Sequence, residues 1–267
     1  MASTRSAVVA AVLALLFIVA LSCRRPAPGA VDRALAACLT ADTSAVAGVN
    51  LDRLRASELY RTIPPDAAGL LESARNAGYI LAAYDGKDIL VAARGDFGSP
   101  PAGAVLLGKN IAVFGSPAAV RAAAAQYNSG QTGARRLLDR AESVAADPLW
   151  MAVRGGASFP LTGNAANLNR LLQLTEYATL GVRLGSRIDL EAAGAGRTPE
   201  AARNLEETLR ALFSLAAAAA AREPDLTALL GSVQVRREGL TVRATLSAAP
   251  EQAGRILGLL SSLAGGR

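Results

Sequence analysis

The strongest constraint on the fold is an order of elements that occurs twice along the chain. In the first copy, Asp85-Gly86 separates two β-rich runs, and this dipeptide favours the tight turn of a hairpin. In the second copy, residues 231–247 alternate between apolar and polar side chains, which is typical of strands with one solvated face. The sequence therefore predicts an α+β fold: a duplicated strand-helix-hairpin-hairpin-helix unit with mainly antiparallel sheets covered by helices.

The predicted boundary between the copies lies in the Gly- and Asn-containing segment 128–133. We expect the first α+β repeat at 41–130, and a connecting helix with a second, enlarged repeat at 131–267. Whether their sheets join edge to edge is left open by the sequence. The predicted elements are a strand and short helix at 44–57, a helix at 66–76, hairpins at 79–94 and 104–115, a helix at 116–127, the connecting helix at 134–146, a strand at 148–155, a helix at 164–175, a hairpin at 177–194 that turns at Gly185-Ser186, a helix at 198–221, the strand pair at 231–247 and a helix at 250–263.

The first 30 residues differ from the rest of the chain. Arg5 precedes an uncharged apolar run of about 15 residues, Ala7 to Leu21, as in a secretory signal peptide. As a helix this run would span roughly 22 Å, which is shorter than the ~30 Å hydrocarbon core of a bilayer. We predict a signal peptide at 1–22, followed by a tether and a short helix at 23–40. An uncleaved anchor and cleavage without lipid attachment are the alternatives.

The residues Ala20, Leu21, Ser22 and Cys23 resemble the lipobox of bacterial lipoproteins, in which a Cys is acylated and becomes the new N-terminus. That family usually has Leu where Ala20 stands and a small or β-branched residue where Leu21 stands. The resemblance implies lipidation of Cys23 and attachment to a membrane of the bacterial cell envelope, facing the periplasm or the exterior. Several acyl chains would hold the protein stably, because each buried CH₂ contributes about 0.8 kcal/mol. Residues 39–60 also look like uncharacterised envelope proteins, a resemblance that brings no activity with it.

Composition excludes several classes of function. The chain has no histidine, which removes the usual general base, the Ser-His and Cys-His pairs and the commonest transition-metal ligand. The net charge is +6, but the basic residues are scattered and aromatic residues make up only 4% of the chain, so we predict no nucleic-acid binding. We predict no catalytic residues, no metal site and no cofactor.

Few polar motifs remain as candidates. Asp85, Asp88 and Asp96 lie around a predicted hairpin, where acidic residues usually serve turns. The segment 103–110 matches most of a phosphate-binding loop, but it is followed by a strand instead of a helix, so we reject that interpretation. Cys38 is expected to be a buried, inert thiol. The six alanines at 216–221 are explained by helix propensity, although they could leave room for a ligand.

These observations predict a membrane-tethered envelope protein with a non-enzymatic binding or structural role and a protein as its partner. The alternative is a carrier that holds an apolar or lipid ligand between sheet and helices. A hydrolase that uses carboxylates alone is a third, weaker hypothesis. A large apolar cavity would favour the carrier. A filled core with an exposed apolar patch would favour the binding role.

Overall fold

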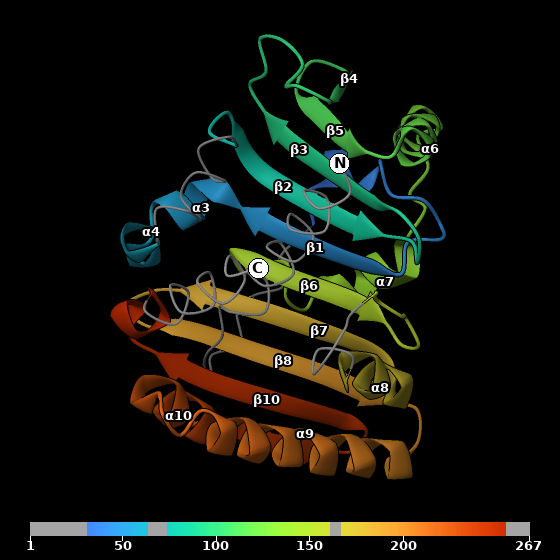
Figure 1. Cartoon of the computed structure of the whole chain (residues 1–267). Helices are drawn as coiled ribbons and strands as arrows, with labels where there is room; N and C mark the ends of the chain where they lie inside the picture. The colour runs from blue at the N-terminus through green and yellow to red at the C-terminus, as the bar shows by residue number, and fades with distance from the viewer. Residues whose placement is uncertain (1–30, 64–73, 161–166, 255–267) are drawn as a thin grey trace.

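The computed structural model of the chain describes residues 31–63, 74–160 and 167–254. Its strands form one ten-stranded sheet with antiparallel neighbours throughout (Figure 1). The strands are β1 (Ala45–Asn50), β2 (Ala77–Tyr84), β3 (Ile89–Gly95), β4 (Val105–Leu107) and β5 (Ile111–Gly115) in the first half, and β6 (Leu149–Arg154), β7 (Thr175–Leu184), β8 (Ile188–Gly196), β9 (Gln234–Glu238) and β10 (Thr241–Ala248) in the second.

The strand order confirms the duplication. It runs β4-β5-β3-β2-β1-β6-β7-β8-β10-β9, so each strand of the first half has a counterpart at the same distance from the centre. The two halves join where β1 pairs with β6, with Ala47 opposite Met151 in the middle of the ladder. The predicted α+β class is confirmed, and the two sheets are one continuous sheet.

Several of the described helices begin after a residue whose side chain favours a helix start. Ser116 and Thr198 each accept a hydrogen bond from a backbone N–H three residues later, and a proline follows each of them. The sequence analysis missed α10, and it made the connecting helix too long. The helices are α2 (Arg33–Ala36), α3 (Leu51–Arg55), α4 (Glu58–Thr62), α6 (Pro117–Asn128), α7 (Arg135–Ala141), α8 (Asn167–Leu174), α9 (Pro199–Ala219) and α10 (Pro224–Gly231). The expected helices at 66–76 and 250–263 lie largely outside the described residues, although a helix does begin at 250.

The described helices lie on both faces of the sheet, and α3 and α4 pack over its central strands on the face that carries Ala47, where Leu51, Leu54 and Leu59 share a cluster with Leu149. We call the face with Ala47 and Met151 face A and the face with Gly48 and Trp150 face B; successive residues of a strand alternate between them. In the first half, α2, α6 and α7 pack on face B, around a cluster that includes Val46. In the second half, α8 and α9 pack on face A. Figure 1 shows α9 and α10 along β10, at the end of the sheet remote from α6.

Two predicted turns and one predicted core residue are corrected by the structure. In the first hairpin, Asp85 still pairs with Asp88, so the turn is centred on Gly86 and Lys87, one position later than expected. In the hairpin between β7 and β8, Leu184 pairs with Ile188, which leaves a loop of three residues, 185–187, instead of two. Leu240, expected to face the core, is 45% exposed because it lies in the turn before β10. Of the other positions expected to face inward, Val235, Val242, Ala244 and Leu246 are buried, whereas Val233 precedes β9 and is only partly buried.

Candidate binding surface

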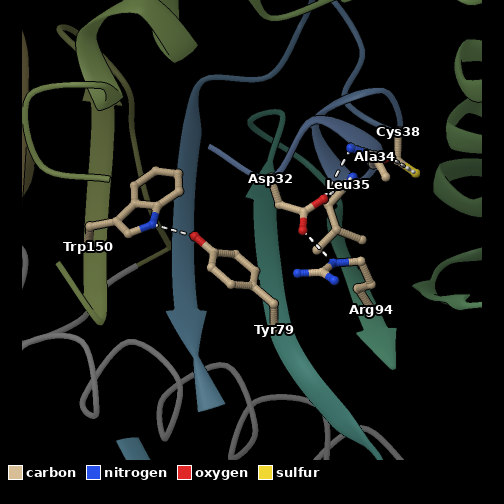
Figure 2. A network of polar contacts seen from close by, with 7 residues as sticks. All are labelled: Asp32, Ala34, Leu35, Cys38, Tyr79, Arg94 and Trp150. Carbon is tan, nitrogen blue, oxygen red and sulfur yellow. Dashed lines mark hydrogen bonds and ion pairs between the residues drawn. The ribbon is translucent and has the colours of Figure 1, made fainter. Parts of the chain in front are cut away.

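The first described helix is joined to the sheet by one carboxylate. Cys23 itself lies outside the described residues. Asp32 accepts hydrogen bonds from the N–H groups of Ala34 and Leu35 at 3.1 and 3.2 Å, which caps α2. The second oxygen of Asp32 accepts a hydrogen bond from Nε of Arg94 on β3 at 2.5 Å (Figure 2). A chain held at its N-terminus is therefore held through this helix cap.

Cys38 follows α2 and is fully buried, as expected. Its Sγ lies 3.8 Å from the carbonyl oxygen of Ala34. Burial, and secondarily the negative charge of Asp32, raises the pKa of the thiol to about 11. The thiol therefore stays protonated at neutral pH, and a nucleophilic role is disfavoured because the thiolate is the reactive form.

A buried hydrogen bond between two side chains joins the two halves. The indole N–H of Trp150 on β6 donates to the hydroxyl of Tyr79 on β2 at 2.6 Å, across β1 (Figure 2). The indole can lie there because β1 carries Gly48 below it; a Cβ at this position would overlap the ring. Burial raises the pKa of Tyr79 to about 12. Both side chains are almost inaccessible to solvent, so this contact is a structural clamp.

The acidic candidates do not form a site. Asp85 accepts hydrogen bonds from the N–H groups of Lys87 and Asp88 at 2.8 and 2.7 Å, so it shapes the turn. Asp96 follows the other end of β3, roughly 23 Å from this turn along a seven-residue strand. Within the described residues, there is no group of three or more His, Cys, Asp or Glu side chains that could hold a metal. In the segment 103–110, the middle residues form β4 and pair with β5.

Face B of the second half is polar. Glu191 and Arg243 form an ion pair there, and Arg183 lies 3.9 Å from the carboxylate of Asp147. Asp147 is buried against Gly181, where a Cβ would meet its carboxylate. Burial raises the pKa of Asp147 to about 6, and the positive charges of Arg183 and Arg53 oppose the shift. This face has the chemistry of a solvated sheet surface with paired charges.

The outer end of face A in the first half is apolar, and Ala93 and Ala112 are buried there. Four larger side chains there are only partly buried and belong to none of the four core clusters formed by the described residues. Val91 and Phe114 are direct cross-strand neighbours within this group. We call this group the sheet patch: Ile89, Val91, Leu106 and Phe114.

A second apolar surface lies on α9 and α10. The first turns of α9 are buried through Ala202 and Leu205, but Leu215 is 68% exposed. No residue of α10 is buried, although the helix carries three leucines. Five leucines here also lie outside the described core clusters. We call them the helix patch: Leu212, Leu215, Leu226, Leu229 and Leu230. The run 211–221 beside them contains no charged side chain.

The described residues form two notable hollows. One, of about 40 Å³, lies between the first hairpin and α6 and includes Thr40, Tyr84 and Asp88. The other, of about 430 Å³, is open to solvent and has a mixed lining that includes Arg75, Asn76 and Phe97. Neither is an enclosed apolar cavity of the kind that holds a lipid.

The sequence analysis missed both patches. Their residues alternate or recur with the ordinary period of buried strands and helices, so the pattern predicts burial. Only the three-dimensional arrangement shows that the described helices lie elsewhere. The absence of charge from 211–221 was the one visible signal, and it was attributed to helix propensity.

Comparison with known proteins supports the fold. No protein-family model matches the chain, and a search of curated proteins gives no match. Among solved structures, crystal form III of TP0453 resembles it with a TM-score of 0.51, 8% sequence identity, and coverage of 86% of this chain and 99% of that chain. Crystal form I of the same protein gives a TM-score of 0.45 at 9% identity over 87% of this chain and 99% of that chain. At this identity the likeness of crystal form III to this chain concerns the fold alone.

Proposed function

We propose that the protein is a non-enzymatic binding protein of the bacterial cell envelope, tethered to a membrane by lipid on Cys23. The observation that carries the binding role is the sheet patch: four neighbouring apolar side chains that are only partly buried and lie outside the described core clusters. Partly exposed apolar clusters of this kind are typical of interaction surfaces.

The polar groups of the described residues argue against catalysis. The buried polar groups that stand out each have a structural partner: Tyr79 holds Trp150, and Asp147 faces Arg183. Asp96 lies at the opposite end of β3 from Asp85 and Asp88, and the carboxylate of Asp85 is bound by two N–H groups of the turn. A hydrolase based on Asp85, Asp88 and Asp96 therefore lacks a geometric basis.

The tether is supported by the signal-like leader and by the anchoring of α2. Asp32 fixes the first described helix to β3, so a lipid nine residues earlier would have roughly 30 Å of extended chain between it and the body. No helix in the described ranges is long and apolar enough to cross a membrane.

Metabolic labelling with radioactive palmitate tests the tether. We expect label in the wild type and in a Cys38→Ala variant, and none in Cys23→Ala. Because Cys38 is buried, its substitution is the matched control for the loss of a thiol. Label that persists in Cys23→Ala, or its absence from the wild type, contradicts the lipoprotein assignment.

The second candidate is a carrier of an apolar or lipid ligand, favoured by the apolar character of the sheet patch. Native mass spectrometry distinguishes the two roles. A lipid that co-purifies with the wild type and is lost from Val91→Asp supports the carrier. A protein free of bound lipid supports the binding role.

A further inference from the structure

We propose that the outer side of α9 packs against the same side of α9 in a second copy, so that two chains form an antiparallel, symmetric dimer. The second half of α9 carries a large apolar side chain in solvent: Leu215 is 68% exposed, whereas Phe213 turns inward and packs on the cluster beneath the helix. Figure 1 shows α9 along the lower border of the molecule, outside β10. The described residues therefore leave this side of the helix accessible to a partner.

The exposed residues of α9 form one continuous face. From position 207 onward they recur every three or four residues, as the neighbours on one side of a helix do. Several of them are small, so the backbone of a second helix can approach closely, and the leucine in their middle supplies the larger apolar contact. The face continues into the turn that follows the helix. We call these exposed residues the α9 outer face: Glu207, Ala211, Ser214, Leu215, Ala218 and Arg222.

The charges at the two ends of the α9 outer face indicate a second copy as its partner. Glu207 and Arg222 are exposed, and neither forms an ion pair within the described part of the chain. The neighbouring charge of α9 is used internally, because Arg210 reaches Glu206 at 2.9 Å and the carbonyl oxygen of Val235 at 2.7 Å. One free charge of each sign therefore remains, with an uncharged helical surface between them.

A two-fold axis through the middle of this face pairs those charges. Positions 207 and 222 are equidistant from the midpoint between Ser214 and Leu215. Antiparallel pairing about that midpoint therefore brings Glu207 of each copy beside Arg222 of the other, whereas parallel pairing would oppose like charges. Leu215 of each copy then lies beside its own counterpart, where it is removed from water. The contact is isologous and closes, so it gives a dimer and not a filament.

The same residues argue against a lipid surface as the occupant. A helix that lies in a membrane interface presents bulky apolar side chains on one face and mainly Lys and Arg on the other. The α9 outer face instead has a single large apolar side chain, small residues and an acidic residue at one end. It therefore offers little to insert into a bilayer and more to a second helix.

The size of the contact links the dimer to the tether. One pair of helices buries less than the roughly 1,600 Å² of a standard interface, so the contact is weak between dilute chains. A lipid on Cys23 confines the copies to one surface and raises their local concentration. In this respect the dimer rests on the proposed function.

Cysteine cross-linking in intact bacterial cells tests the dimer on the full chain. We introduce Leu215→Cys into a Cys38→Ala background and add a short bis-maleimide. Because position 215 lies beside the two-fold axis, we expect a cross-linked species of twice the chain's mass. Leu240→Cys is the matched control, since it also replaces an exposed leucine. The carbonyl oxygen of Leu240 accepts a hydrogen bond from Gly196 near the start of α9, an end that antiparallel pairing places roughly 30 Å from its counterpart, so we expect no cross-link from this variant.

Charge reversal identifies the surface that makes the contact. Glu207→Arg or Arg222→Glu, each combined with Leu215→Cys, places like charges together at both ends of the contact, and we expect the initial rate of cross-linking to fall about threefold or more. The double reversal restores opposite charges, so we expect the rate to return to that of Leu215→Cys alone. Both positions are exposed, and unchanged unfolding transitions check that the variants fold.

Three results overturn the dimer in cells whose wild type takes up palmitate: no cross-link from position 215, equal cross-linking from positions 215 and 240, or a double reversal that does not recover. A position 215 that a water-soluble maleimide cannot reach, without a cross-link, would indicate lipid as the occupant and overturns the dimer as well. If the wild type takes up no palmitate, the tether fails. The dimer is then decided by the same cross-link in the purified chain at a concentration on the order of 1 mM, so the two failures are distinguishable.

Discussion

The clamp between the two halves predicts that a single methyl group on β1 destabilises the protein strongly. In Gly48→Ala, the added Cβ would overlap the indole of Trp150, which lies flat across β1. The added Cβ is fixed to the backbone of β1 and cannot move away, so the indole ring must shift. Its hydrogen bond to Tyr79, 2.6 Å long in the structure, is then lost.

Two costs and one gain determine the magnitude. Overpacking in a filled core costs about 1–3 kcal/mol. Leaving the buried hydroxyl of Tyr79 and the indole N–H without partners costs about 1–3 kcal/mol more. Replacing glycine by alanine inside a strand returns roughly 0.5–1 kcal/mol. The expected net loss in the free energy of unfolding is about 1–5 kcal/mol, which for a chain of this size lowers Tm by roughly 2–20 °C.

A double-mutant cycle followed by urea unfolding isolates the contact. In a Trp150→Leu background the ring is absent, so Gly48→Ala should cost about 0 kcal/mol or stabilise slightly. In a Tyr79→Phe background the ring remains, so the overlap should still cost about 1–3 kcal/mol. If Gly48→Ala destabilises the Trp150→Leu protein as much as the wild type, the overlap is not the cause and the reasoning fails.

Three further predictions concern the buried titratable groups and the helix cap. The pKa of Asp147 is raised to about 6 in the folded state, so the folded protein holds the proton more tightly than the unfolded chain, and stability from this group falls as pH rises from about 4 to 6. Chemical unfolding measures the free energy of unfolding of Asp147→Asn minus that of the wild type. This difference should be about 2 kcal/mol more favourable to the variant at pH 7.5 than at pH 4; an equal difference at both pH values contradicts the raised pKa. Asp32→Asn keeps the cap of α2 but weakens the contact with Arg94, whereas Asp32→Ala loses both, so thermal melts should rank Asp32→Ala below Asp32→Asn by about 1 kcal/mol; equal melting temperatures would remove the role of the cap. In a Cys23→Ser chain, Cys38 should resist alkylation at pH 8 until denaturant is added, because its pKa is about 11 and it is buried; rapid native labelling would show that the site opens.

The sequence predicts where the strands lie better than it predicts what covers them, because the alternation of side chains along a strand is a local pattern. Alternation in 231–247 places Val242 and Ala244 inward, and the structure buries both. The turn at Gly86 and Lys87 is displaced from the expected Asp85-Gly86 because the Asp85 side chain bonds the next two N–H groups that follow Gly86. A dipeptide rule does not include that competing side chain.

The joining of the sheets and the clamp depend on contacts far apart in the chain. In the sequence alone, Gly48 is only a residue with low strand propensity. The indole of Trp150, about a hundred residues later in the chain, explains why a glycine stands at this position. The same holds for the sheet patch: Val91 and Phe114 have the pattern of core residues. Their partial exposure follows from where α6 and α9 lie, which no local window contains.

Two faces of the sheet, one in each half, provide the last argument for an interface. In the second half, face B is left uncovered by the described helices along β8 and β10, and it carries paired charges such as Glu191 and Arg243. In the first half, face A buries Ala93 and Ala112 of β3 and β5, and their neighbours Val91 and Phe114 are only partly buried. The fold itself tolerates charge at partly buried positions of the sheet, as face B demonstrates, so the sheet has no need of large apolar side chains at such positions. Apolar side chains there stabilise a monomer less than buried ones do, because water still reaches them, but they stabilise a complex in which water is excluded. The difference between the faces is therefore best explained by a surface that is buried on binding.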